Sequence, residues 1–129
     1  MPYKVVRLID GRYYSATGDH KSGMRCFQYF TDKPTTVCDN NFSNGPLCAF
    51  NFIFSATRFK AWLENYEIET TRKIRNNYRI FEVDTKPSAL KCVWYIGKYG
   101  KYIKPYSELL DDTLLCQSVR LIKDVTETL

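Results

Sequence analysis

LCAFNFIFSATRFKAWLENY, residues 47–66, is the most informative segment of this sequence. Its first part, from Leu47 to Phe54, is almost wholly apolar and would place apolar side chains on both faces of an extended chain. Such a run predicts a central strand that is covered on both sides. Ser55 then predicts the start of a helix, because its hydroxyl can accept a hydrogen bond from a first-turn backbone N–H that would otherwise lack a partner.

After Ser55, four apolar residues recur at the i, i+3, i+4 and i+7 spacing of one helical face: Phe59, Trp62, Leu63 and Tyr66. This stripe predicts a helix over residues 56–66 that packs its apolar side on the preceding strand. The strand and the helix together form the predicted core unit. On this interpretation, most of the aromatic residues, which make up 16% of the chain, belong to the core.

The rest of the chain predicts further strands around this unit. Asp10-Gly11 lies between two strand-like runs and predicts a tight hairpin, because both central residues of such a turn must accept positive φ. Strands are expected at residues 3–9, 12–15, 24–30, 78–83 and 91–96, and one or two final strands at residues 113–116 and 119–125. Loops are expected at residues 17–23, 38–46 and 97–105, a loop or helix extension at residues 67–77, and one helical turn at residues 107–112. The predicted fold is a single α+β domain, residues 1–129, with a mostly antiparallel sheet of about six strands packed on one main helix.

Composition narrows the class of protein. The 129 residues are 44% hydrophobic and 26% charged, which is typical of a globular domain long enough to build a core without metals or disulfides. No apolar run is long enough to span a membrane, and the first residues lack the apolar segment of a signal peptide. The five cysteines are irregularly spaced and form no C-x-x-C pair, so we expect reduced, structural thiols and a cytoplasmic protein that needs no cofactor.

Positive charge is concentrated in one region. The chain carries a net charge of +5, but residues 71–106 alone hold nine basic and two acidic residues, a local net charge of +7. Within residues 98–106, lysines alternate with tyrosines and glycines. Cations bind phosphates and aromatic rings stack on bases, so the pattern predicts contact with an anionic nucleotide or nucleic acid. A solvated hairpin, whose lysines keep a sheet edge soluble, is the alternative interpretation.

The expected ligand-binding residues all lie in this basic region. Three arginines are expected to contact phosphate, and two lysines and two tyrosines are expected to form the opposite wall of the site: Arg72, Arg75 and Arg79, then Lys98, Tyr99, Lys101 and Tyr102. The segment contains no motif of a known nucleic-acid-binding module.

Catalytic residues are hard to assign from the sequence. His20, the one histidine, lies in a polar loop, and no nucleophile motif accompanies it. Glu82 and Asp84 share one face of a predicted strand, where they could serve acid–base catalysis or simply meet a cationic neighbouring strand. The sequence therefore leaves three hypotheses for the function. The first is a ligand-binding protein, and the second is a virion or assembly protein whose exposed rings pack against another protein chain. The third is an enzyme that uses one of these carboxylates.

Three segments carry a resemblance to known proteins: YKVVR (residues 3–7) with Ser15, GPLCAF (residues 45–50) with Ala56 and Phe59, and DTLLCQSVRL (residues 112–121). They resemble segments of small proteins encoded by phages, large DNA viruses and bacteria. Such viral proteins include sponges that sequester cyclic-nucleotide immune signals, such as the Thoeris anti-defence proteins. The resemblance implies a non-enzymatic phage or viral protein that would bind its ligand by aromatic stacking and by Arg or Lys contacts to phosphate, alone or as an oligomer.

Overall fold

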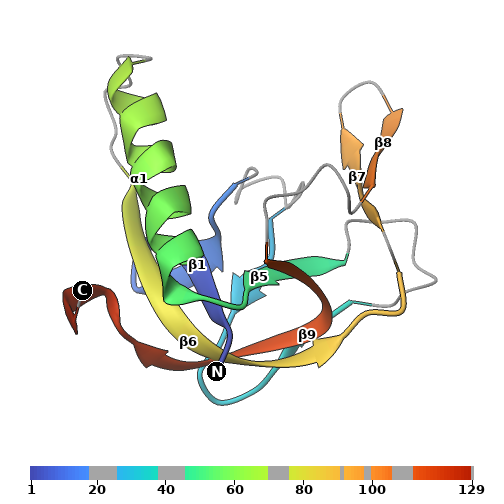
Figure 1. The fold of residues 1–129 in the computed structure, drawn as a ribbon, viewed down its shortest axis with the longest axis horizontal. Coiled ribbons are helices and arrows are strands. Elements are labelled where there is room, and N and C mark those ends of the chain that lie inside the picture. Colours follow the sequence, from blue (N-terminus) through green and yellow to red (C-terminus); the bar gives the residue numbers. More distant parts are fainter. Residues whose placement is uncertain are drawn as a thin grey trace.

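The computed structural model describes residues 1–17, 26–37, 46–69, 76–90 and 112–128, and only the backbone of residues 92–97 and 100–105. In these parts of the chain, one α-helix, α1 (Ile53–Glu69), lies on a seven-stranded sheet, and a separate two-stranded hairpin projects from it (Figure 1). The strand pairings are antiparallel. The predicted α+β class with a mostly antiparallel sheet is therefore confirmed.

Four strands close into a ring at the centre of the sheet. In their order around the ring they are β1 (Tyr3–Ile9), β6 (Asn77–Pro87), β9 (Thr113–Asp124) and β5 (Leu47–Phe50). The long strands β6 and β9 pair along much of their length, whereas β1 meets β5 at Tyr3 opposite Phe50. The expected central position of β5 is confirmed, because it lies between β1 and β9.

Three short strands extend the sheet beyond the ring: β2 (Arg12–Ser15) beside β1, β3 (Gln28–Tyr29) beside β2, and β4 (Thr35–Thr36) beside β9. The predicted hairpin turn between β1 and β2 is confirmed. Its central residues Asp10 and Gly11 both have positive φ, 51° and 77°, as a two-residue turn between twisted antiparallel strands requires.

The ring divides the core into two apolar clusters. Side chains such as Val6 and Leu121 gather inside the ring. Val5, next to Val6 along β1, points the other way and packs with Ala56 and Leu63 of α1. Successive residues of a strand point to opposite faces, so one strand contributes to both clusters. A final turn of 3₁₀ helix, η2 (Thr126–Thr128), follows β9.

α1 begins earlier than predicted, at Ile53, so the expected longer strand and the capping role of Ser55 are wrong. Asp112, just before β9, fixes this start. Its backbone carbonyl accepts a hydrogen bond from the Asn51 N–H at 3.1 Å, and its carboxylate accepts one from the Phe52 N–H at 3.0 Å. The Phe52 carbonyl in turn accepts from the Ser55 N–H at 3.2 Å, so Phe52 rather than Ser55 occupies the capping position.

Other boundaries differ from the sequence prediction. Within the loop expected at residues 97–105, the chain forms β8 (Gly100–Pro105), which pairs with β7 (Cys92–Gly97), as the hairpin interpretation expected. Of the one or two strands expected near the C-terminus, the chain forms one continuous strand, β9. Three segments of the prediction lie outside the described residues. They are residues 18–25 and 38–45, which carry His20 and most of two expected loops, and residues 106–111, which carry most of the expected helical turn.

The cysteines that the structure describes are free thiols, as predicted: Cys26, Cys48 and Cys116. Burial raises the pKa of the Cys116 thiol to about 11, so this group is protonated at neutral pH and is a poor nucleophile. None of the helices in the described ranges is long and apolar enough to cross a membrane.

Leu121 tests the contribution of the cluster inside the ring. Leu121 is fully buried, whereas its neighbour Ile122 is 37% exposed. We expect Leu121→Ala to lower the free energy of unfolding by about 2–5 kcal/mol, because it leaves a cavity in a closed core. Ile122→Ala should cost less than about 1 kcal/mol. Urea denaturation of both variants measures the difference, and equal losses would contradict the assignment of the core.

Candidate functional site

The structure describes the side chain of one of the seven expected ligand contacts, Arg79 of β6. Four of the others lie outside the described residues: Arg72, Arg75, Lys98 and Tyr99. The last two, Lys101 and Tyr102, belong to β8, where the structure describes the backbone alone.

Arg79 is held by two carboxylates. Its Nε donates to Asp124 at 2.8 Å, and its Nη1 donates to Glu127 at 2.8 Å. The hydrogen bond to Asp124 holds the pKa of Arg79 above its ordinary value. Burial alone would raise the pKa of Asp124, but hydrogen bonds from Arg79 and Thr126 outweigh it and leave that pKa lowered. These two ion pairs use two of the five N–H donors of the Arg79 guanidinium, and both carboxylates would repel a phosphate that approached it.

The hairpin of β7 and β8 is part of the basic region. Its register places Tyr95 opposite Tyr102 and Ile96 opposite Lys101, with Gly97 and Gly100 at the turn end. It forms a sheet of its own, separate from the seven-stranded sheet (Figure 1). This arrangement brings tyrosines from two strands to the same level of one hairpin.

A buried carboxylate, Glu67, ties the last turns of α1 to the start of β6. The Tyr78 hydroxyl and the Asn76 side-chain amide both donate to its Oε1, at 2.7 and 2.6 Å, and the Asn76 backbone N–H donates to its Oε2 at 3.2 Å. The contacts fix the chain on both sides of residues 70–75, which contain two of the expected phosphate-binding arginines. The burial of Glu67 could have been predicted from the sequence, because Glu67 follows Leu63 by one helical turn on the buried face of the helix.

Glu82 and Asp84, the candidate acid–base pair, lie on β6 opposite cationic residues of β9. Glu82 faces Lys123 in the register, and Asp84 faces Arg120. Opposite charges across neighbouring strands stabilise a sheet, so this placement favours a structural role for both carboxylates.

The sequence prediction misplaced the aromatic residues of α1. Five large apolar side chains on or just before the helix are between 45% and 67% exposed, and we call this set the aromatic face: Phe52, Phe54, Trp62, Tyr66 and Ile68. Of the predicted stripe, only Leu63 is buried, and Phe59 is half-buried. The prediction that Phe52 and Phe54 belong to a buried strand, and that Trp62 and Tyr66 pack in the core, is therefore wrong.

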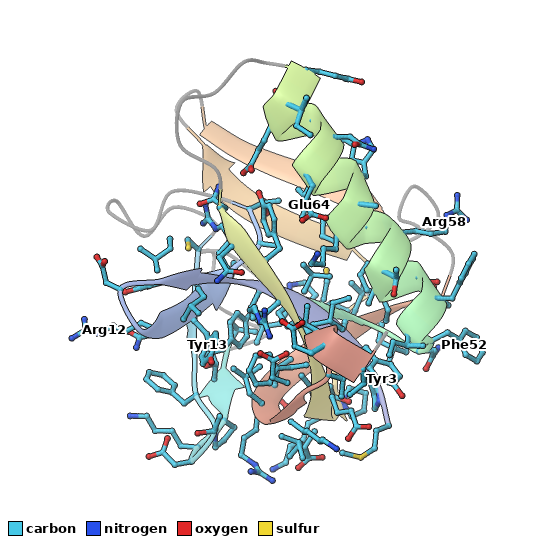
Figure 2. All side chains as sticks on the ribbon, turned by 90° about the vertical axis from the view of Figure 1, so that its left-hand side faces the viewer. Tyr3, Arg12, Tyr13, Phe52, Arg58 and Glu64 are labelled. Carbon is cyan, nitrogen blue, oxygen red and sulfur yellow. The ribbon has the colours of Figure 1, made fainter. Side chains whose placement is uncertain are left out.

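A ladder of rings connects the core to the aromatic face. The buried Phe50 ring lies 5.7 Å from Phe59, which stacks on Trp62 at 6.2 Å, and Trp62 stacks on Tyr66 at 5.8 Å. The Arg58 guanidinium lies 5.7 Å from the Phe54 ring. Figure 2 shows Phe52 and Arg58 projecting from the helix away from the sheet. The aromatic side chains are thus held in place while much of their surface stays exposed.

Comparisons with protein-family models, with curated proteins and with solved structures found no match to this chain. In the parts of the chain that the structure covers, no group of three or more His, Cys, Asp or Glu residues could hold a metal ion. Two features of the chain bear on its function: the aromatic face at α1 and the concentration of basic residues in positions 71–106 of the sequence.

The pH dependence of stability can report on the hydrogen bond between Tyr78 and Glu67. Burial first, and then the hydrogen bond to Glu67, raise the pKa of Tyr78 from 10.0 to about 12. Because the pKa is raised, the Tyr78 hydroxyl loses its proton at a higher pH in the folded state than in the unfolded state. The stability that the protonated hydroxyl contributes is therefore complete below pH 10 and is lost between pH 10 and pH 12. The loss should reach about 2–3 kcal/mol.

In the Tyr78→Phe variant, the free energy of unfolding should therefore fall less steeply between about pH 10 and pH 12 than in the wild type. Urea denaturation at several alkaline pH values measures this slope. The comparison uses the slope rather than the absolute stability, because the variant also lacks a hydrogen bond. Parallel slopes in the two proteins would contradict the role of Tyr78.

Proposed function

We propose that this protein is a binding protein that docks on another protein chain through the aromatic face of α1. The observation that carries the proposal is the exposure of five large apolar side chains at one helix, in a chain whose closed ring already buries its own core. Exposed apolar residues that occur singly need no explanation, whereas a cluster of them is typical of an interaction site.

The size of the surface supports this function. At their observed exposures, the five side chains offer roughly 600 Å² of surface, which is at the upper end of what a monomer leaves exposed. Aromatic residues are enriched at the centres of protein interfaces, where truncation of one ring costs about 2 kcal/mol or more. The free thiols of Cys26, Cys48 and Cys116 support a reducing compartment such as the cytoplasm.

Binding of an anionic nucleotide or nucleic acid by residues 71–106 is a second candidate function, favoured by the local charge of +7 and by the tyrosines paired across the β7–β8 hairpin. Arg72, Arg75, Lys98 and Lys101 would contact phosphate, and Tyr99 and Tyr102 would stack on a base. Arg79 would join them through its remaining N–H donors, against the repulsion of its two carboxylate partners. If the ligand were a cyclic nucleotide, the protein could sequester an immune signal, as the resemblance to phage sponges implies.

Photo-crosslinking in the producing cell tests the protein-docking function. We expect a photoreactive phenylalanine analogue in place of Trp62 to join the full chain covalently to a protein chain. The same analogue in place of Ile122, an exposed apolar residue of β9, should not. Adding Phe54→Ser to the Trp62 variant should reduce the crosslinked product roughly tenfold or more, because it removes a second ring from the surface. Equal products from both positions, or none, would contradict the proposal.

Salt dependence tests the second candidate. Fluorescence anisotropy with a single-stranded oligonucleotide and with a cyclic dinucleotide should show an affinity that falls as salt rises, with a slope of about 0.7 per phosphate contacted for the single strand. The double variant Lys98→Glu, Lys101→Glu should weaken binding by roughly tenfold or more, since each reversal removes an attraction and adds a repulsion. Lys123→Glu, an exposed change on β9, is the control. Binding that ignores both salt and the hairpin lysines would exclude this function.

A further inference from the structure

We infer that the chain which docks on α1 is a second copy of this protein, with the two helices packed antiparallel about Ala61. This inference rests on the proposed docking function and names its partner. It is argued from the residues that the helix presents outward, from the order of charges along it and from the area that it can bury.

Five exposed residues of α1 form one stripe along its outer side: Phe54, Arg58, Ala61, Asn65 and Ile68. Their spacing of i, i+4, i+7, i+11 and i+14 keeps them on one helical face. Ala61 is at the centre and has the smallest side chain, which lets a second helix approach closely. Phe54 and Ile68 lie at equal distances before and after it, about two turns away.

This outer stripe is complementary to itself when a second copy runs in the opposite direction. An antiparallel pairing centred on Ala61 places Phe54 of each copy against Ile68 of the other, so both ends of the contact bury an aromatic ring on an aliphatic side chain. Ala61 meets Ala61 of the second copy at the two-fold axis, as an isologous interface requires.

Charge along α1 favours the same orientation. The basic residues Arg58 and Lys60 are in its first half, and the acidic residues Glu64 and Glu69 are in its second half, whereas Glu67 there is buried against β6. An antiparallel pairing therefore brings the basic half of each helix to the acidic half of the other, whereas a parallel pairing brings like charges together. Arg58 and Glu69 are three turns apart on one side of the helix. In a pairing centred on Ala61, Arg58 of one copy is level with residue 64 of the second, and Glu69 of the second lies about 7.5 Å further along the axis, a distance that the two long side chains can span.

The order of these charges is the reverse of what a lone helix prefers. The helix dipole favours acidic side chains in the first turn and basic ones in the last, and α1 has neither. Antiparallel pairing offsets this, because it brings the N-terminal end of each helix dipole near the C-terminal end of the other. Lys60 and Glu64 already form an ion pair within the helix at 3.2 Å, so the contact between copies depends chiefly on Arg58 and Glu69.

The available area predicts a weak dimer. α1 has 17 residues and is therefore about 25 Å long. With Trp62 at its side, the outer stripe can bury roughly 500–600 Å² in each copy, or about 1,000–1,200 Å² in total, at the lower limit for a specific interface. We expect a dissociation constant of about 10–100 µM.

Sedimentation equilibrium on the full chain from about 5 to 200 µM tests the dimer. The wild type should approach twice its monomer mass of 15.2 kDa as its concentration rises. Ala61→Arg should raise the dissociation constant at least about tenfold, because two bulky cations would meet at the two-fold axis. Arg58→Glu should also weaken the dimer, and adding Glu69→Arg should restore it. Arg12→Glu, an exposed change of the same charge at the β1–β2 hairpin, is the matched control.

Circular dichroism verifies that the variants fold, which their exposed positions lead us to expect. An unchanged circular dichroism spectrum of Arg58→Glu would show that a weaker dimer in that variant does not come from loss of the helix. A wild type that stays monomeric, or a dimer that ignores Ala61→Arg, overturns the inference. If the wild type is monomeric but Trp62 crosslinks to a different protein, the proposed docking function stands and only the identity of the partner is wrong. If neither self-association nor crosslinking occurs, both fail.

Discussion

Closure of the ring between β1 and β5 is the constraint on which the rest of the structure depends. The two strands meet at Tyr3 and Phe50, and the side chain of Lys4 adds a second link by donating a hydrogen bond to the Cys48 carbonyl. Lys4 is buried, and its ammonium group lies 4.9 Å from the centre of the Tyr29 ring. Burying a cation is costly unless polar partners surround it, so this seam specifies which strands come together as well as holding them.

In the closed ring, the position of α1 is fixed by contacts at both of its ends. Only two residues separate the end of β5 from the start of the helix, and Asp112 binds the backbone of both. At its other end, Glu67 fixes the helix to β6. A helix held at both ends needs few buried side chains of its own, and the buried side chains of α1 are Ala56, Leu63 and Glu67. Its remaining surface can therefore carry rings such as Trp62 and Tyr66 that stay largely exposed.

The sequence predicted the parts of the fold that local patterns control. Asp10-Gly11 predicted its turn, and strand-like runs of the sequence predicted β1, the first half of β6 and most of β9. It misplaced the start of α1, because the group that sets this start, Asp112, is distant in sequence and adopts an unusual positive φ of 58°. It could not show that Phe52 and Phe54 are exposed, because apolar periodicity reports which residues could be buried and not how many the sheet has room to cover. The basic region was found from composition, whereas the carboxylates that occupy Arg79 come from the far end of the chain.

The ladder of rings from Phe50 to Tyr66 has a thermodynamic consequence for binding. A side chain that moves freely before association loses about 0.5–1.5 kcal/mol of conformational entropy when a partner immobilises it. Phe59, Trp62 and Tyr66 are already stacked on one another, and Phe59 also contacts the buried Phe50 ring, so much of this entropy is lost when the protein folds and not when it binds. A surface prepared in this way can recognise its partner as a rigid template, and a small area can then give a measurable affinity.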